Sequence, residues 1–328
     1  MALLNDNKTI SLPNVALNQG LFRLSFKAMG THCEISFSAD SPDQAESFRK
    51  KALIWVRNFE KRYSRYLPDS LISRINESAG SSQPIPIDAE DQRLFNLCNT
   101  LYFFTDGLFD PSSLPLSLLW NFKSKKPQVP DPQKIDFALT KIGWDKVIIK
   151  DSQVYLPESG MGIDFGGFGK EFAVDRVLEI AQEHKIKNII VNFGGDLRTL
   201  GSPPDSDHWV IAIENPMDPG QPRFTLSSND LAVATSGNYQ RFFEIDGKRY
   251  GHLLDHRTGY PTPPENLSST VIAHSCIEAG ILATCSLLQK PKQGLSMIDR
   301  YFTAEGCIWS SDGIFWSKKF ESYLHYNN

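Results

Sequence analysis

Four clusters of glycine and polar residues lie where predicted strands or helices end, and their residue types suit the binding of an anion. They are AMGT (residues 28–31), DFGGFGK (164–170), NFGGD (192–196) and TSGNY (235–239), with GHLLDHRTG (251–259) after the last. Glycines just before a helix let the backbone approach a ligand, and the free N–H groups and helix dipole there favour a phosphate. Lys170, in the first turn of the helix after the second cluster, adds a positive charge. This cluster predicts a pyrophosphate site, and a tight strand-to-helix turn without a ligand is the alternative.

The elements that position these clusters are a mixture of strands and helices. Residues 21–37 follow a strand pattern, and a helix is predicted to about Arg62 because Ser41 can cap it and Pro42 suits its first turn. Further helices are predicted over about residues 89–104, 171–183 and 275–289, with a loop at 105–115, a surface insertion at 123–131 and mostly strands beyond residue 201. Because strands and helices do not alternate strictly, the pattern favours an α+β fold.

Composition narrows the possible functions. The chain has 328 residues, a formal net charge of −4 and no basic stripe, which argues against nucleic-acid binding. The five cysteines have no metal-binding spacing and predict buried free thiols. Residues 1–20 are predicted to be a loose N-terminal arm, and residues 21–328 one domain. No signal peptide pattern and no apolar run of ~20 residues is seen, so we expect a cytoplasmic protein without a membrane span.

The order of the motifs is more specific than any single motif. Several motifs follow one another within residues 26–288. In order, they are MGT, SRYLPDSLISRIN, GLFDPS, DFGGFGKEFAVDRV, VNFGGDLRTLG, ATSGNYQRFFE, GKRYGHLLDHRTGYP and IEAGILAT. This ordered set is similar to that of the FAD:protein FMN transferase (ApbE) family. The resemblance implies a single domain of the T-fold, an α+β architecture with an FAD site between its halves.

The same resemblance implies a reaction and a set of site residues. The reaction is Mg²⁺-dependent cleavage of the FAD pyrophosphate, in which FMN passes to a Ser or Thr hydroxyl of an acceptor protein as a phosphoester and AMP leaves. The residues implied at FAD are Met29, Tyr66, Leu108, Phe109, Asp110, Asp164, Lys170 and Leu254, and those at the metal are Thr284 and a backbone carbonyl near Gly167. His252 is the candidate general base, because a histidine with a pKa near neutral can accept the proton of the hydroxyl.

Ordinary structural roles are the alternatives for these residues. Met29 and Tyr66 can be core or rim residues, and Asp110, which precedes a proline, can be a turn residue. Asp164 can serve only to bind loop amides. A histidine in a strand pattern, as His252 is, often has a purely structural role.

The chain departs from the family pattern where the metal is expected. The family motif E-A-D-x-x-[AD/S]-T reads here as residues 278–284, with Gly280 in place of the metal-binding aspartate and Ala283 in place of a second carboxylate that some members carry. Of the metal-binding side chains that the resemblance implies in this motif, Thr284 is retained. We therefore expect a weakened Mg²⁺ site, which a Gly280→Asp substitution should restore.

Glu278 can substitute for the aspartate, although Ser275 makes it part of a capping box. Asp255, His256 and His274 are further candidates, with unrelated surface histidines as the alternative for the last two. Two other departures are Leu71 in place of an acidic residue and Glu171 in place of a glycine.

Three functions remain open from the sequence. The first is a flavin transferase with a weakened or remodelled metal site. The second is a degenerate relative that binds FAD or FMN as a carrier or sensor without transferring it, and the third is an FAD pyrophosphatase that uses water in place of the acceptor hydroxyl. Gly280 distinguishes the first two functions, because it removes a negative charge that flavin transfer would otherwise use at the metal.

Overall fold

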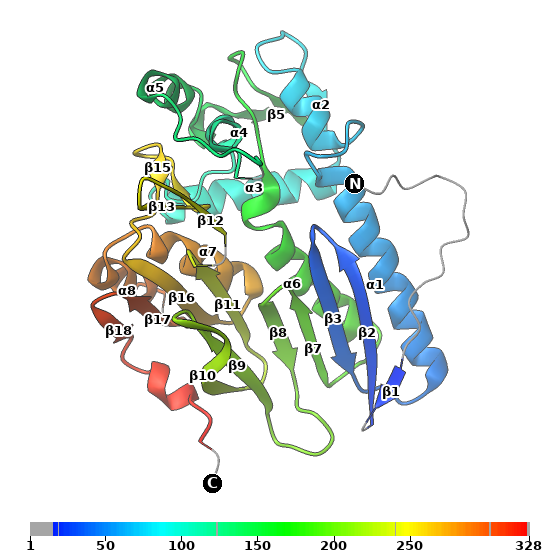
Figure 1. Ribbon diagram of the computed structural model, residues 1–328. Coiled ribbons are helices and arrows are strands. Elements are labelled where there is room, and N and C mark those ends of the chain that lie inside the picture. Colours follow the sequence, from blue (N-terminus) through cyan, green and yellow to red (C-terminus); the bar gives the residue numbers. More distant parts are fainter. Residues whose placement is uncertain (1–15, 19, 123, 240, 302, 327–328) are drawn as a thin grey trace.

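The centre of the protein is a nine-stranded antiparallel sheet (Figure 1). The computed structural model describes residues 16–18, 20–122, 124–239, 241–301 and 303–326. In spatial order the strands are β1 (Ala16–Asn18), β2 (Leu21–Ala28), β3 (Thr31–Phe37), β7 (Ile189–Phe193), β8 (Asp196–Leu200), β11 (Ala232–Gly237), β16 (Asn266–Ala273), β17 (Glu305–Ser310) and β18 (Gly313–Trp316). Every neighbouring pair is antiparallel. The turns at one end of this sheet contain three of the four sequence clusters.

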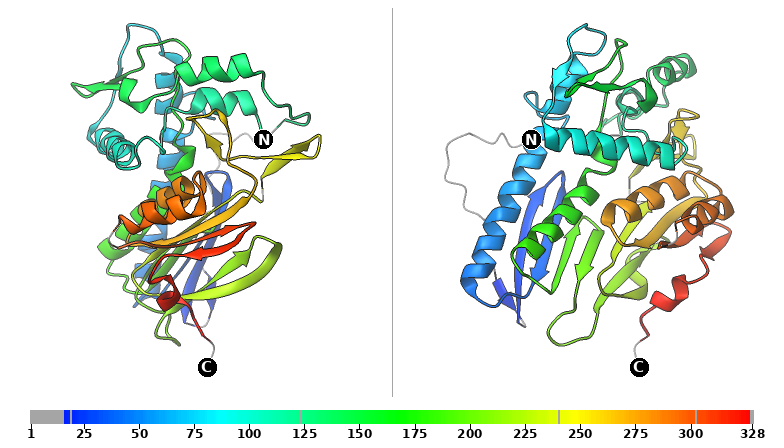
Figure 2. Two further views of the ribbon diagram at one scale, coloured as in Figure 1. Left: turned by 90° about the vertical axis from the view of Figure 1, so that its left-hand side faces the viewer. Right: turned by 180° about the vertical axis from the view of Figure 1, so that it is seen from behind.

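Four helices cover one face of the sheet (Figure 2). They are α1 (Pro42–Tyr63), α6 (Gly169–Glu183), α7 (Cys276–Leu287) and α8 (Pro291–Asp299). In α1 the Ser41 side chain accepts a hydrogen bond from the Gln44 amide (3.2 Å), and residues such as Phe48, Ala52 and Phe59 recur at helical spacing on its buried side. These apolar stripes and the sheet form the main core, which fixes the helices on the sheet.

The opposite face of the sheet carries a second, smaller core. There the hairpin of β9 (Trp209–Asn215) and β10 (Asp218–Ser228), together with the short helix η3 (Phe320–Tyr323), packs on side chains from β8, β11, β16 and β17. The protein therefore has a helix layer, a sheet layer and a hairpin layer.

The rest of the chain forms a region above one end of the sheet (Figures 1 and 2). It contains α2 (Leu71–Glu77), β4 (Ile85–Pro86), α3 (Ala89–Phe104), α4 (Leu114–Trp120), α5 (Pro132–Thr140), η1 (Trp144–Lys146), β5 (Ile148–Lys150), β6 (Gln153–Tyr155), β12 (Phe242–Ile245), β13 (Lys248–Gly251), β14 (Leu254–Asp255) and β15 (Tyr260–Pro261). A third core, which contains Trp120, Ile135 and Phe243, joins α4 and α5 to the β12–β13 hairpin.

The α+β, single-domain fold predicted from the sequence is confirmed. The helices predicted over residues 89–104 and up to Arg62 correspond to α3 and α1. Sequence patterns missed α2, α4, α5 and α8, because seven to nine residues give too few turns for a periodicity to emerge. Helix α4 begins inside the predicted 105–115 loop.

The predicted N-terminal arm lies largely outside the described residues. Within it, strand β1 pairs with β2, so this part of residues 1–20 belongs to the sheet. Among the residues that the structure describes, no helix has the length and apolar character needed to cross a membrane.

A buried carboxylate joins α6 to α7. Asp175 accepts hydrogen bonds from the backbone amides of Cys276 (2.8 Å) and Ile277 (3.0 Å) in the first turn of α7, and from Arg198 on β8 (2.9 Å). It is only 8% exposed. The interaction fixes the start of α7 relative to α6 and the sheet.

We predict that Asp175→Ala lowers the free energy of unfolding by about 3 kcal/mol, because it leaves a partly buried guanidinium and two amides without their acceptor. Urea denaturation of the variant measures this loss. Glu179→Ala, which removes an exposed carboxylate from the same helix, is the control and should change stability by less than about 1 kcal/mol. Equal losses in the two variants would contradict the structural role of Asp175.

Candidate active site

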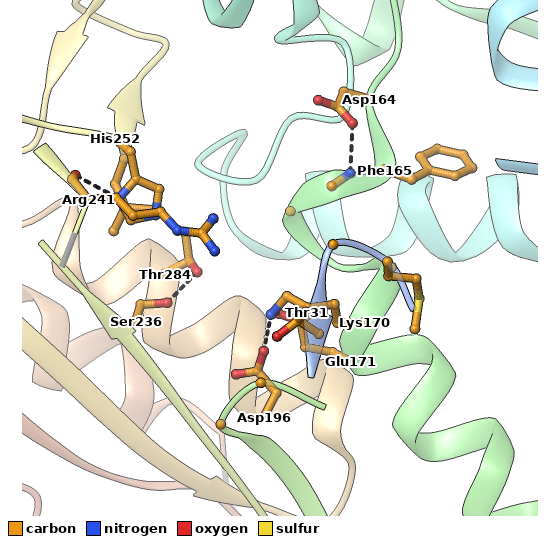
Figure 3. A pocket seen from close by; sticks show the side chains of 18 of the residues that line it. Thr31, Asp164, Phe165, Lys170, Glu171, Asp196, Ser236, Arg241, His252 and Thr284 are labelled. Atoms are coloured by element: carbon orange, nitrogen blue, oxygen red, sulfur yellow. Dashed lines mark hydrogen bonds and ion pairs between the residues drawn. The ribbon is translucent and has the colours of Figure 1, made fainter. Parts of the chain in front are cut away.

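A single cavity of about 2460 Å³ is lined by every residue that the family resemblance places at FAD, at the metal or as the general base. It lies between the cluster-bearing end of the sheet and the region above it, and Figure 3 shows part of its lining. The predicted residues that line the cavity are Met29, Tyr66, Leu108, Phe109, Asp110, Asp164, Gly167, Lys170, His252, Leu254 and Thr284. The fold thus brings together residues from segments that are far apart in the sequence, although their individual roles stay predictions.

The glycine-rich turn before α6 faces this cavity. The short helix η2 (Phe165–Gly167) begins at Asp164, whose side chain accepts hydrogen bonds from the Gly166 amide (2.8 Å) and from Arg65 Nε (2.7 Å). A Cβ atom at Gly167 would meet nothing within 4 Å, so the backbone there is open to a ligand. The first residues of α6 have no side-chain cap, which leaves their N–H groups available for an anion.

Lys170 lies in a group of charges below this turn (Figure 3). Its ammonium forms an ion pair with Asp196 at the β7–β8 turn, and it lies 3.8 Å from Oε1 of Glu171. Burial by itself would lower the pKa of Lys170, but the carboxylates of Glu171 and Asp196 outweigh it and raise the pKa. Lys170 is therefore a permanently charged group at the cavity wall.

Glu171 is the most unusual member of this group. It is 6% exposed, and its Oε2 atom has no hydrogen-bond partner among the described residues. Burial raises its pKa to about 7, against the lowering effect of Lys170. An unpartnered, buried carboxylate oxygen is costly in free energy. It marks a position where a proton, a water or a cation would be stabilising.

Thr284 and Ser236 present hydroxyl groups on the neighbouring wall. Thr284 Oγ1 on α7 lies 2.6 Å from Ser236 Oγ on β11, and both residues line the cavity. Hydroxyl oxygens retain lone pairs after one such bond, so this pair can bind a hard cation or a phosphate oxygen.

His252 has one ring nitrogen committed and one available. Nδ1 lies 3.2 Å from the backbone carbonyl oxygen of Arg241. Because a carbonyl oxygen can only accept, neutral His252 must carry its proton on Nδ1, which leaves Nε2 as a proton acceptor. Burial, followed by the charges of Arg241 and Lys170, lowers the pKa of His252 to about 4. The expectation of a pKa near neutral is therefore wrong for the unliganded protein, and His252 is uncharged at pH 7.

The β2–β3 turn and the end of α1 form the opposite rim. Met29 adopts a positive φ of 50° in this tight turn, and its amide donates to Glu60 Oε1 (2.8 Å). Tyr66 is 63% exposed, and the guanidinium carbon of Arg65 lies 4.3 Å from the centre of its ring. Tyr66 is thus a rim residue that presents a flat aromatic face, a surface on which a planar ring can stack.

Asp110 is occupied by structural contacts. Its carboxylate accepts from the Ser112 amide (2.7 Å), the Ser112 hydroxyl (2.6 Å) and the Trp144 amide (3.2 Å). It is 8% exposed, like its neighbours Leu108 and Phe109. These contacts favour the turn role for Asp110, with the three residues shaping the cavity wall.

The candidates for a replacement metal ligand do not converge at the cavity. Glu278 forms the predicted capping box with Ser275, and Asp255 accepts from Arg257. His256 contacts the carbonyl of Gly107, and His274 is exposed and does not line the cavity. Because His256 lines the cavity and His274 does not, the alternative of two unrelated histidines is favoured. Within the described part of the chain, no three His, Cys, Asp or Glu residues are grouped as metal ligands.

Sequence reasoning did not assign roles to Asp196, Ser236 and Arg241, which the structure places beside the predicted residues. The available signal was their position in or next to the glycine clusters. In the sequence Glu171 is only a departure from the family pattern, and nothing in the spacing connects it to Gly280.

Comparison with known proteins shows which family this chain resembles. The ApbE family profile matches residues 29–308. The chain is 28% identical over 312 residues to the FAD:protein FMN transferase of Haemophilus influenzae, covering 92% of this chain and 90% of the relative. It is 30% identical to a protein of the same name from Klebsiella pneumoniae, covering 73% and 74% of the two chains. The crystal structure of the ApbE protein of Thermotoga maritima superimposes with a TM-score of 0.85 at 28% identity, covering 93% of this chain and all of that one.

The low pKa of His252 makes a direct prediction for NMR. In a pH titration its imidazole should stay neutral until about pH 4, whereas an unperturbed histidine titrates near ~6.5. Because the unfolded chain binds this proton at higher pH than the folded one, His252 should reduce stability as the pH falls from 6.5 towards 4. His252→Gln assigns the resonance and should remove that contribution. A titration midpoint of His252 at or above ~6.5 would contradict the lowered pKa.

Proposed function

This chain belongs to the ApbE family, and we propose that it catalyses FAD-dependent protein flavinylation, transferring FMN from FAD to a Ser or Thr hydroxyl of an acceptor protein with release of AMP. The observation that carries the proposal is the presence of an anion-binding helix start, a lysine and a histidine with an unprotonated nitrogen in one cavity. These are the groups that a phosphoryl transfer needs for positioning, charge neutralisation and proton removal.

We propose that the pyrophosphate of FAD lies at the turn before α6. The backbone at Gly167 is open to the cavity, and Lys170 brings a fixed positive charge. Both favour phosphate oxygens. The cavity exceeds the roughly 300–1,000 Å³ typical of small-molecule sites, which is consistent with a dinucleotide and part of an acceptor chain bound together.

His252 is the proposed general base. In the reaction the acceptor oxygen attacks the phosphorus that bears the riboflavin group, the bond from that phosphorus to the bridging oxygen of AMP breaks, and the hydroxyl proton passes to His252 Nε2. The charges of Arg241 and Lys170 contribute to the low pKa of His252. Bound phosphates would offset those charges and raise the pKa of His252, so we propose that the base becomes effective when FAD is present.

Mg²⁺ fits the residues at the cavity floor. Hard cations bind oxygen ligands, and the cavity lining offers the Thr284 hydroxyl and Glu171, whose Oε2 has no hydrogen-bond partner among the described residues. We propose that Thr284 and the carbonyl near Gly167 contribute to holding it. When bound, the ion would neutralise charge on the pyrophosphate oxygens.

The family assignment sets the expected partners. FAD is the proposed substrate, and the acceptor is a protein with an accessible Ser or Thr. A cytoplasmic location stays a prediction.

Flavin binding is the first test of this function. Titration of the protein with FAD should quench or shift the flavin fluorescence, because the isoalloxazine ring leaves water for a site with an aromatic rim. Failure to bind FAD, FMN and ADP at high micromolar concentration would refute the proposal.

Incubation with FAD, MgCl₂ and peptides that contain Ser or Thr should then add FMN to a peptide, as measured by intact mass. Release of FMN and AMP without a modified peptide would indicate a pyrophosphatase, and binding without turnover a carrier.

Replacement of the base separates chemistry from binding. His252→Ala should reduce the rate of FMN transfer by roughly 10²–10⁴-fold while the Kd for FAD changes only a few-fold, because a general base acts in the transition state. The control is His274→Ala, which removes an exposed histidine outside the cavity and should leave the rate and the Kd unchanged. Full transfer activity in folded His252→Ala protein would exclude His252 from the mechanism.

A further inference from the structure

Helices α6 and α7 lie against each other where Gly280 on α7 faces Glu171 on α6. A Cβ atom built on Gly280 would lie 2.6 Å from Cγ of Glu171, 3.2 Å from its carboxyl carbon and 3.0 Å from Oε1. Distances below 3.0 Å are not tolerated without movement. The side chain of Glu171 therefore already occupies the space that a side chain at position 280 would need.

This position puts a carboxylate next to residue 280, one helical turn before Thr284 on α7. Residues 280 and 284 are one helical turn apart and lie on the same face of α7. An aspartate at 280 would hold its carboxyl carbon one bond beyond Cβ, and the carboxyl group of Glu171 lies next to that same Cβ position. Both Glu171 and Thr284 line the cavity (Figure 3).

One oxygen of this carboxylate is uncommitted. Lys170 lies near Oε1, whereas Oε2 is buried and has no partner among the described residues. Lys170 itself is paired with Asp196. Mg²⁺ sites that act on phosphates commonly use one or two protein carboxylates together with phosphate oxygens and waters. A single carboxylate at this point, with a hydroxyl and the substrate, meets that requirement.

We propose that Glu171, reaching across from α6 into the space left by Gly280 on α7, is the carboxylate ligand of a divalent cation that binds together with the pyrophosphate of FAD. This inference rests on the proposed function for the presence of FAD and extends it to the metal. Gly280 is then a consequence of the Glu171 side chain, and the metal site is remodelled, with its carboxylate supplied from a different helix.

The test measures metal binding without measuring catalysis. Mn²⁺ binding is followed by electron paramagnetic resonance, with and without saturating FAD. The wild-type protein should bind one Mn²⁺ in the presence of FAD, and Glu171→Gln, which keeps the size of the side chain, should weaken Mn²⁺ binding by roughly tenfold or more. Glu179→Gln removes one charge from the exposed face of the same helix and should bind Mn²⁺ as the wild type does.

The affinity for FAD supplies a second readout. In EDTA, Glu171→Gln should bind FAD at least as tightly as the wild type, because it removes a negative charge near the pyrophosphate. This result also shows that the variant is folded. Mg²⁺ should then tighten FAD binding to the wild type and have little effect on the variant. Unchanged Mn²⁺ affinity in folded Glu171→Gln, or no FAD-dependent Mn²⁺ binding to the wild type, would overturn the proposal.

Exchange of the two residues tests the geometry. Gly280→Asp alone should lower the melting temperature without tightening Mn²⁺ binding, because the new side chain collides with Glu171. This result would correct the sequence-based expectation that Gly280→Asp restores the site. The double variant Glu171→Gly/Gly280→Asp moves the carboxylate to α7 and should recover most of the Mn²⁺ affinity that Glu171→Gly loses. A double variant as weak as Glu171→Gly would contradict a shared ligand position.

The outcomes for metal and function are separable. Loss of Mn²⁺ binding in Glu171→Gln supports the ligand assignment even if no flavin transfer is ever detected, a result that would refute the proposed function alone. Transfer by the wild type together with normal Mn²⁺ binding by Glu171→Gln would refute the ligand assignment alone.

Discussion

The site depends on the contact between two helices, and a buried carboxylate fixes that contact. Asp175 on α6 accepts from the first amides of α7 and from Arg198 on the sheet, so the two helices cannot slide past each other without exposing unpaired polar groups. The beginning of α6 and the middle of α7 then lie at a fixed separation. At that separation a Cβ atom at position 280 would meet Cγ of Glu171, and here Glu171 carries the side chain while position 280 is glycine.

The charges at the cavity would make binding of the proposed substrate and binding of the proposed metal depend on each other. Lys170 and Arg241 favour the phosphates, whereas Glu171 and Asp196 hold Lys170 in place and repel phosphates when no cation is present. A cation and a pyrophosphate that bind together satisfy both sets of charges, so each ligand is expected to increase the affinity for the other. The same reasoning applies to His252, whose low pKa reflects burial and neighbouring positive charge that the phosphates would offset.

This arrangement bears on how the departures from the family pattern are interpreted. Taken alone, Gly280 removes a metal ligand and favours a carrier that binds flavin without transferring it. Taken with Glu171, it becomes one half of an exchange that retains one carboxylate at the same point in the cavity. Neither substitution can be evaluated separately, because residues in contact do not contribute independently.

The sequence by itself determined the α+β class, the approximate bounds of the long helices and part of the set of residues around the cavity, because periodicity, caps and ordered motifs are local or linear signals. The capping box of Glu278 was likewise predictable from its spacing to Ser275. Only the tertiary structure decided that Glu171 fills the space at Gly280, that Asp110 is occupied by loop contacts, and that burial lowers the pKa of His252. These three outcomes depend on distances and desolvation between segments far apart in the chain, which no spacing along the sequence encodes.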